Sequence, residues 1–185
     1  YSESLFVEYY YGKEAGFEYV RGTRKGIDND KPIIGHYDVN SEGSSDMYPK
    51  GGNMLHTLRQ IVNNDEKWRE ILRGLNSTFY HQTVTTKQIE DYLSNATGVN
   101  LTAFFNQYLR DTRIPTLEYF FKKGFINFRW TNCVSGFDMP VKVILNGAEQ
   151  VLAPKTEWKN IATKTENQKL DVNRNFYVAS FNITE

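Results

Sequence analysis

The hydrophobic pattern changes its period once along this chain, near Pro115, and that change limits the folds open to it. Before this proline, apolar residues recur three and four positions apart, which is typical of amphipathic helices. After it, short runs rich in aromatic and β-branched residues are separated by turn residues, which is typical of strands. The sequence therefore predicts an α+β chain, with helices over residues 1–115 and a small antiparallel β-sandwich over residues 116–185.

The helical half divides into segments with recognisable ends. Gly12 and Gly26 are expected to end the first two helices, Asp65 and Asn100 to cap the fourth and sixth, and Thr85 to form a capping box with Gln88. Short connections imply antiparallel neighbours, in an α-bundle or an α-solenoid. The predicted helices cover residues 2–11, 13–25, 50–63, 65–79, 86–94 and 101–110, and the predicted strands lie within residues 116–124, 125–132, 139–147, 149–154 and 176–185.

One connection is too long for a compact bundle. Residues 26–47 show no periodicity over more than twenty positions, and loops of this length are usually functional or disordered. The loop carries His36 and ends at Tyr48, where the next helix is expected to begin.

Charge and composition exclude several classes of partner. Lys+Arg and Asp+Glu both number 22, so the formal net charge is zero and there is no general attraction to nucleic acid or to an anionic membrane. No apolar run approaches the roughly 20 residues of a membrane span. Cys133 is the single cysteine, which excludes an internal disulfide and a multi-thiolate metal site.

The residues that most often carry out catalysis are sparse. His36, His56 and His81 are the only histidines, and no two are spaced as a local metal-binding pair. His56 and His81 are each expected to be a surface histidine or a satisfied structural one. His36 could line a cleft, although an ordinary loop position is the simpler expectation. The chain also lacks a nucleophile elbow and a phosphate-binding loop, so no metal site is predicted within it.

Tyr48 is the remaining candidate for chemistry. A phenol donates a hydrogen bond, and at the start of a helix it is suited to stabilising an oxyanion. Pro49 suits the first helical turn, and Gly51 and Gly52 are expected to permit close approach of a neighbouring helix. A purely structural turn would use the same residues.

Several stretches in order resemble the zinc aminopeptidase family of the aminopeptidase N and leukotriene hydrolase type, the gluzincins. The turn Tyr48-Pro49-Lys50-Gly51 resembles the family's catalytic-tyrosine motif. Residues 1–20 are similar to the helix that carries the third zinc ligand, entered just after that glutamate. Residues 84–119 resemble a late helical segment of the family, and the β-rich tail resembles its small β-sandwich domain.

The resemblance implies a function for the longer protein. Family members hold one zinc ion and hydrolyse N-terminal residues from peptides, with the motif tyrosine donating to the oxyanion. We therefore expect Tyr48 to be catalytic, with Lys50 and Gly51 supporting the turn. The resemblance places the helical half in a thermolysin-like catalytic domain and the zinc ligands before residue 1.

The start of the chain fits this interpretation. It has no initiator methionine and begins inside a helical pattern, which predicts a piece of a longer protein. Alone, this piece is expected to bind no zinc, to be inactive, and to self-associate through apolar helix faces that include the Leu5–Tyr11 stripe.

Two other interpretations stay open. The same fold without zinc ligands would serve as a scaffold that binds a peptide or protein partner, and a free-standing helical plus fibronectin-like adhesion module would require a natural start at Tyr1. The compartment is not fixed by the sequence, although the lack of disulfides and the resemblance fit a bacterial periplasmic or exported enzyme. The preferred substrate residue is not fixed either.

Overall fold

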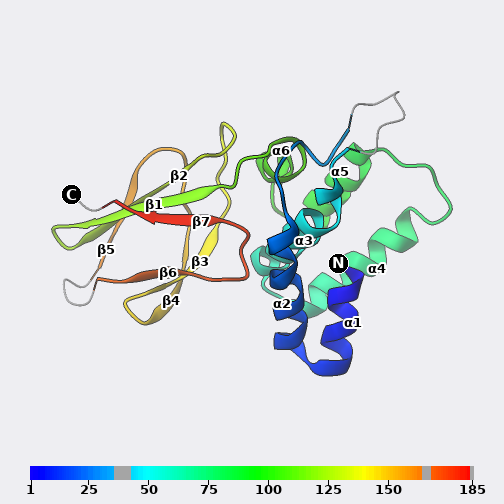
Figure 1. Ribbon diagram of the computed structural model, residues 1–185, viewed down its shortest axis with the longest axis horizontal. Helices are drawn as coiled ribbons and strands as arrows, with labels where there is room; N and C mark the ends of the chain where they lie inside the picture. Colours follow the sequence, from blue (N-terminus) through cyan, green and yellow to red (C-terminus); the bar gives the residue numbers. More distant parts are fainter. Residues whose placement is uncertain (36–42, 164–167, 184–185) are drawn as a thin grey trace.

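The computed structural model describes residues 1–35, 43–163 and 168–183. A helical part and a β-sandwich lie side by side, and the chain passes from one to the other after α6 (Figure 1). The α+β architecture predicted from the change of period is confirmed. The helices are α1 (Ser2–Tyr11), α2 (Lys13–Gly22), α3 (Pro49–Val62), α4 (Asp65–Thr78), α5 (Thr86–Thr97) and α6 (Thr102–Arg110), with 3₁₀ helices at Thr23–Gly26 and Ser45–Met47.

Local capping chemistry sets most of the helix ends. The predicted capping box is confirmed, because Thr85 Oγ1 accepts from the Gln88 N–H at 3.3 Å and Gln88 Oε1 accepts from the Thr85 N–H at 2.8 Å. The predicted cap of α4 is wrong by one residue. Asn64, and not Asp65, accepts the Lys67 N–H at 2.9 Å, so Asp65 is the first helical residue.

Other boundaries differ from prediction in instructive ways. The helix expected over residues 13–25 is α-helical only to Gly22 and then tightens into a 3₁₀ turn. Gly12 has a positive φ of 92° but an extended ψ of 166°, so it is not a left-handed helical cap. The sixth helix begins after Leu101, one residue later than expected, with Asn100 Oδ1 accepting the Thr102 N–H at 3.1 Å.

Two small sheets form the sandwich. In one, the strand order is β5-β2-β1-β7, and in the other it is β4-β3-β6. Every pairing is antiparallel except β1 with β7, which is parallel, a departure from the antiparallel prediction. The strands are β1 (Thr116–Lys122), β2 (Phe125–Thr131), β3 (Val141–Leu145), β4 (Ala148–Leu152), β5 (Lys159–Ala162), β6 (Leu170–Val172) and β7 (Ala179–Asn182).

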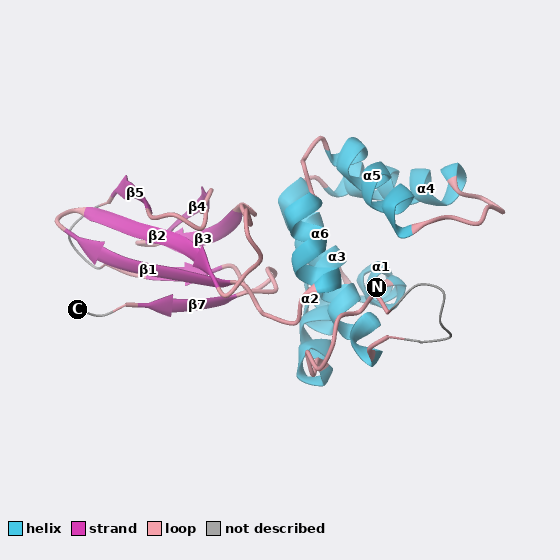
Figure 2. Cartoon of the chain, turned by 90° about the horizontal axis from the view of Figure 1, so that it is seen from above, coloured by secondary structure: helices cyan, strands magenta, loops and turns pink. Residues whose placement is uncertain are grey.

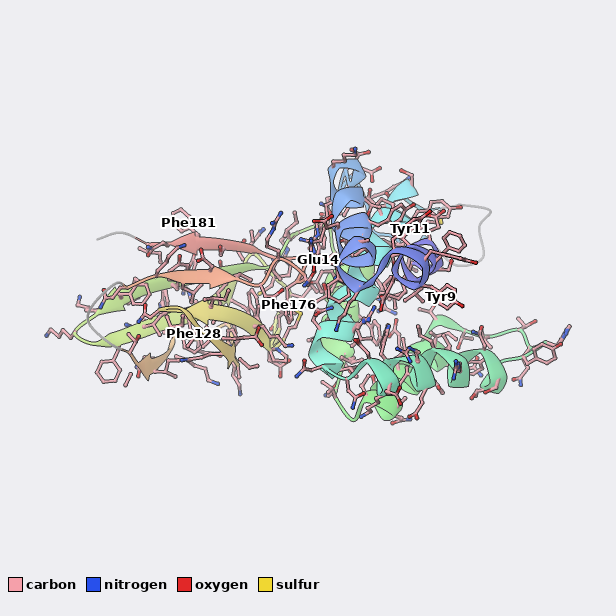
Figure 3. All side chains as sticks on the ribbon, turned by 90° about the horizontal axis from the view of Figure 1, so that it is seen from below. Tyr9, Tyr11, Glu14, Phe128, Phe176 and Phe181 are labelled. Atoms are coloured by element: carbon pink, nitrogen blue, oxygen red, sulfur yellow. The ribbon has the colours of Figure 1, made fainter. Side chains whose placement is uncertain are left out.

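A single hydrophobic core joins the two parts. Leu58, Trp68 and Phe105 of the helices belong to the same buried cluster as Trp130 and Phe176 of the sandwich. Figure 2 shows α6, α3 and α2 on the side of the helical part that faces the sheets. The last strand is reached through a loop, residues 173–178, that packs against the helical part, and Figure 3 shows Phe176 at this junction. Among the described residues, no helix combines the length and apolarity that a membrane crossing needs.

The first helix buries little of its surface. Ser4 is the only buried residue of α1, and the helix packs against α2. The aromatic side chains Phe6, Tyr9, Tyr10 and Tyr11 are 59%, 82%, 62% and 75% exposed. Tyr9 and Tyr11 extend outward from α1 in Figure 3. The predicted exposure of this apolar stripe is therefore present in the structure.

We predict that Gly16→Ala destabilises the chain by about 1–3 kcal/mol, because overpacking forces backbone shifts. A Cβ at this position would lie 2.6 Å from Glu8 Cβ and 2.8 Å from the Ser4 carbonyl oxygen, so α1 would have to move. Urea unfolding followed by circular dichroism measures the change. Gly22→Ala is the matched control, since a Cβ there meets no atom within 4 Å. It should be neutral or stabilising by up to about 1 kcal/mol; equal losses for both would contradict the packing argument.

Candidate functional site

Tyr48 is positioned at the start of α3 and faces solvent. It is the residue that precedes the first helical turn, its carbonyl accepts the Gly52 N–H at 3.0 Å, and its side chain is 77% exposed. Pro49 occupies the first helical position, where its missing N–H leaves no unmet bond. The phenol is thus presented at the surface by a well-defined backbone.

Buried polar contacts fix the chain that leads into Tyr48. Asp46 is fully buried, and its carboxylate accepts the backbone N–H groups of Asp28 at 3.0 Å and Asn29 at 2.7 Å. Ser44 Oγ donates to Asp30 Oδ1 at 2.6 Å. The two ends of the long loop are therefore tied together directly beside the tyrosine. His36, which the sequence placed in this loop, lies outside the described residues.

Lys50 ties the first turn of α3 to the chain that follows α6. Its side chain is fully buried, and Nζ donates to the Asp111 carbonyl oxygen at 2.8 Å, just after α6. Burial lowers the pKa of Lys50, while the negative charges of Asp46 and Asp111 oppose that shift. The geometry gives Lys50 a structural contact rather than a place in the open cleft.

The glycines after Tyr48 do not mediate the close approach that was expected. A Cβ on Gly51 would meet no atom within 4 Å, and one on Gly52 would lie 3.9 Å from Val20 Cγ2, an ordinary contact. Among the described glycines, tight helix contacts occur at Gly16, between α1 and α2, and at Gly74, between α4 and the Tyr92 side chain of α5. The close-approach prediction for Gly51 and Gly52 is wrong for this reason.

Asn53 joins α3 to α2 and was missed by the sequence analysis. Its Nδ2 donates to the Val20 carbonyl and to Thr23 Oγ1, both at 3.0 Å, and to the Pro49 carbonyl at 2.9 Å. Its Oδ1 accepts from Arg24 Nε at 2.6 Å. The available signal was the spacing of polar residues at positions 50, 53 and 57, which share one helix face.

A cleft of about 430 Å³ opens beside Tyr48. It is bounded by the start of α1, by α2 and by the first turn of α3, and Tyr1 and Glu3 also line it. Tyr19 donates to Glu3 Oε2 across this cleft at 2.8 Å, and that hydrogen bond raises the pKa of Tyr19. Its size lies within the usual range of ligand pockets.

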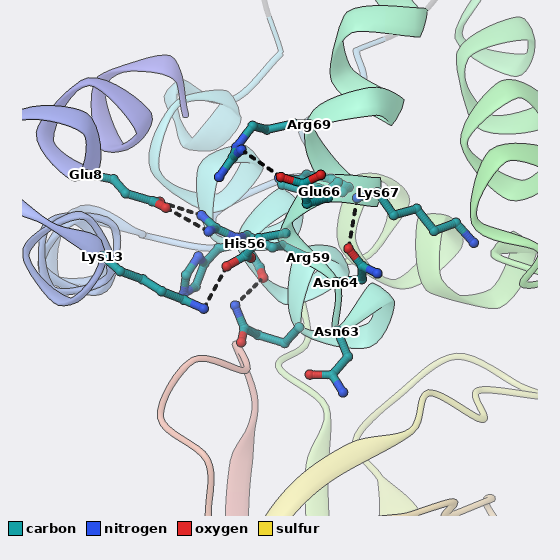
Figure 4. A network of polar contacts seen from close by, with 12 residues as sticks. Glu8, Lys13, His56, Arg59, Asn63, Asn64, Glu66, Lys67 and Arg69 are labelled. Atoms are coloured by element: carbon teal, nitrogen blue, oxygen red, sulfur yellow. Dashed lines mark hydrogen bonds and ion pairs between the residues drawn. The ribbon is translucent and has the colours of Figure 1, made fainter.

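A buried arginine holds the walls of the cleft together. Arg59 on α3 makes a bidentate ion pair with Glu8 of α1, at 2.5 and 2.8 Å, and donates to Asp65 of α4 at 2.9 Å (Figure 4). Lys13 adds a second contact to Asp65 at 2.7 Å. These bonds lower the pKa of Asp65 to about 2.

The two described histidines have structural roles, as predicted. His56 is buried, packs edge-on against Phe17 with 4.6 Å between ring centroids, and places Nε2 3.1 Å from Asn175 Oδ1. Burial lowers its pKa to about 4. His81 is exposed in a turn with φ of 53° and contacts Tyr80 edge-on.

The described residues do not present a metal-ligand set. Within residues 1–35, 43–163 and 168–183, no three or more histidine, cysteine, aspartate or glutamate side chains converge in a way that could hold a metal ion. A catalytic zinc site needs three protein ligands. Zinc therefore does not fit this part of the chain on its own, although the cleft offers the phenol and Glu3 at its wall.

Comparison with known proteins supports a peptidase-related fold. No protein-family model matches the chain, and no curated protein sequence matches it. Among solved structures, Legionella pneumophila aminopeptidase A in complex with aspartic acid is similar, with a TM-score of 0.70 and 14% sequence identity. The match covers 98% of this chain and 23% of the Legionella chain. The chain therefore shares the fold of the part of the Legionella structure that it matches, and it spans about a quarter of that chain's length.

We predict that His56 makes the chain less stable as the pH falls from 7 to 5. The unfolded imidazole titrates near 6.5 and the folded one near 4, so the unfolded state binds more protons in this interval and stability is lost on acidification. The expected loss is roughly 2 kcal/mol from this group. Urea unfolding at the two pH values measures it.

The matched variants for this prediction are His56→Gln and His81→Gln. The first removes the titrating ring but retains a donor toward Asn175, so most of the pH-dependent loss should disappear. The second changes an exposed histidine and should preserve the loss. An unchanged pH dependence in His56→Gln would show that the buried ring is not its source.

Proposed function

We propose that this chain is part of a zinc-dependent aminopeptidase and that Tyr48 is the residue that stabilises the oxyanion. The proposal rests chiefly on one observation: an exposed phenol at the start of α3 borders a cleft, on a fold similar to an aminopeptidase over 98% of the chain. The residues that hold zinc belong, in this proposal, to polypeptide outside residues 1–185.

Tyr48 is required only to donate one hydrogen bond to the oxyanion. Attack of water on a peptide carbonyl produces an oxyanion, and a donor aimed at that oxygen lowers the barrier most when it is already in place. Tyr48 is preceded by the buried Asp46 contact and followed by the buried Lys50 and Asn53 contacts. These fix the backbone from which the phenol extends, so little reorganisation is required. Lys50 and Gly51 belong to the motif but support the turn.

The size and position of the cleft are consistent with a peptide substrate. Its volume of about 430 Å³ would hold a few residues of a peptide, and because the cleft is open to solvent beside Tyr48, the rest of the peptide could extend out of it. The bound zinc would supply an activated water and polarise the scissile carbonyl. The chain by itself would hold no catalytic zinc and would be inactive.

We predict that Tyr48→Phe lowers kcat of the longer zinc-containing protein about 10²–10³-fold, the effect of removing one oxyanion donor. Hydrolysis of aminoacyl anilides measures it. The substitution removes only a hydroxyl from an exposed ring, so folding should not change. Tyr11→Phe, at an equally exposed ring on α1, is the control and should retain full activity.

Two results would count against the proposal. Near-normal turnover of Tyr48→Phe would remove this residue from the mechanism. Absence of peptidase activity from a folded, zinc-loaded longer protein would instead favour the alternative of a peptidase-like scaffold that binds a peptide or protein partner. Stoichiometric tightly held zinc in the 185-residue chain alone would contradict the placement of the ligands elsewhere.

We also propose that the isolated chain self-associates through the aromatic face of α1, formed by Phe6, Tyr9, Tyr10 and Tyr11. Contiguous exposed apolar surface promotes association. The double variant Phe6→Ser/Tyr10→Ser should weaken self-association about tenfold or more, since each tenfold step needs only about 1.4 kcal/mol. Sedimentation equilibrium measures the dissociation constant.

The control for self-association is Tyr80→Ser, at a residue that is 72% exposed beyond the end of α4. It should leave the dissociation constant unchanged. A wild-type chain that is monomeric at high concentration, or an equal effect of the control, would refute the proposed interface.

A further inference from the structure

A second cleft, of about 700 Å³, lies between the helical part and the sandwich. Its walls come from the end of α2, the following 3₁₀ turn, and the chain around β6 and β7. Figure 1 shows the loop between β6 and β7 turned toward α2. Three arginines line this cleft: Arg21, Arg24 and Arg174.

Arg24 carries a positive charge that no carboxylate of the described residues pairs with. Its Nε donates to Asn53 Oδ1 at 2.6 Å, and its Nη1 donates to the Arg174 carbonyl at 2.9 Å, so both acceptors are neutral. Its Nη2 is buried and has no hydrogen-bond partner among the described residues. Burial lowers the pKa of Arg24, and the nearby charges of Arg21 and Arg174 lower it further. The group is held in place without charge compensation.

The other charges leave the cleft positive. Arg174 is exposed, and its side chain has no hydrogen bond or ion pair in the described part of the chain. Arg21 pairs with the exposed Glu14 at 2.6 Å. Asp171, the one carboxylate among the described residues of the cleft wall, is paired with Lys169 at 2.8 Å. Among the described residues, Glu14 and Asp171 are therefore already paired, and the guanidinium groups of Arg24 and Arg174 have no carboxylate partner.

Neutral donors lie on the same wall. Asn173 uses Oδ1 to accept the Asn175 N–H at 2.9 Å, which leaves its amide nitrogen available. Ser180 contributes a hydroxyl with no partner among the described residues. Arginine forks and neutral donors together form a typical binding surface for tetrahedral or planar oxyanions.

We propose that this cleft binds a small oxyanion of the phosphate class, which bridges the helical part and the sandwich. The Arg24 contact to the Arg174 carbonyl already connects the two parts across the cleft, so the ligand completes an existing junction. This site is distinct from the cleft at Tyr48 and does not depend on the proposed peptidase activity.

Thermal unfolding of the 185-residue chain with increasing inorganic phosphate tests the inference. Because a ligand that binds only the folded state stabilises it, Tm should rise saturably, by about 3–6 °C at ten times the dissociation constant. Sodium chloride at equal ionic strength should not reproduce the rise. Acetate forms a third arm: a rise with acetate as well would extend the ligand class to carboxylates, and no rise would restrict it to phosphate.

Arg174→Ala is the decisive variant, because this exposed side chain can be removed without loss of an internal contact. It should abolish the phosphate-dependent rise. Arg69→Ala, at an exposed arginine of α4, should retain it. Amide chemical shifts supply a second readout, and phosphate should move those of residues 173–180 in the wild type only. An equal rise with chloride, an unchanged rise in Arg174→Ala, or no rise with phosphate would overturn the proposal.

Discussion

The arrangement of the whole helical part depends on the buried polar face of α3. Lys50, Asn53, Thr57 and Arg59 are all buried, and removing such groups from water costs free energy unless each finds a partner. Their partners come from α1, α2, α4, the end of α6 and the sandwich, so satisfying this one helix specifies where its neighbours must lie. A buried hydrogen-bonded network of this kind rigidifies a fold.

The same reasoning explains why the two parts act as one unit. The backbone of Tyr177 is held from both sides, since its N–H donates to Thr57 Oγ1 at 3.0 Å and its carbonyl accepts from Tyr108 at 2.8 Å. The sandwich is thus attached through hydrogen bonds inside a continuous core rather than through a flexible linker. The Arg24 contact to the Arg174 carbonyl adds a junction near the surface.

The sequence predicted the features that local chemistry determines. The change of period located the boundary between helices and strands, and the Thr85–Gln88 box was found because all its atoms lie within four residues. The strands β5 and β6 were missed because four and three residues are too few to show alternation. The sequence placed Tyr48 at the start of a helix, as the structure has it. Asn53 and Arg59 were missed, since polar residues on a helix ordinarily indicate solvent. Their partners lie up to 51 positions away, beyond any local pattern.

The contacts at the two ends of the long loop have a consequence for variation. Asp46 and Ser44 hold residues 28–30 directly, and the Ile34 N–H donates to the Leu109 carbonyl at 3.2 Å, so hydrogen bonds fix the path into α3 at several points. A connection of another length could keep the phenol in place as long as these contacts are retained, because the entropy of loop closure changes only slowly with length. The position of the phenol thereby depends on a few anchoring contacts and not on the length of the connection.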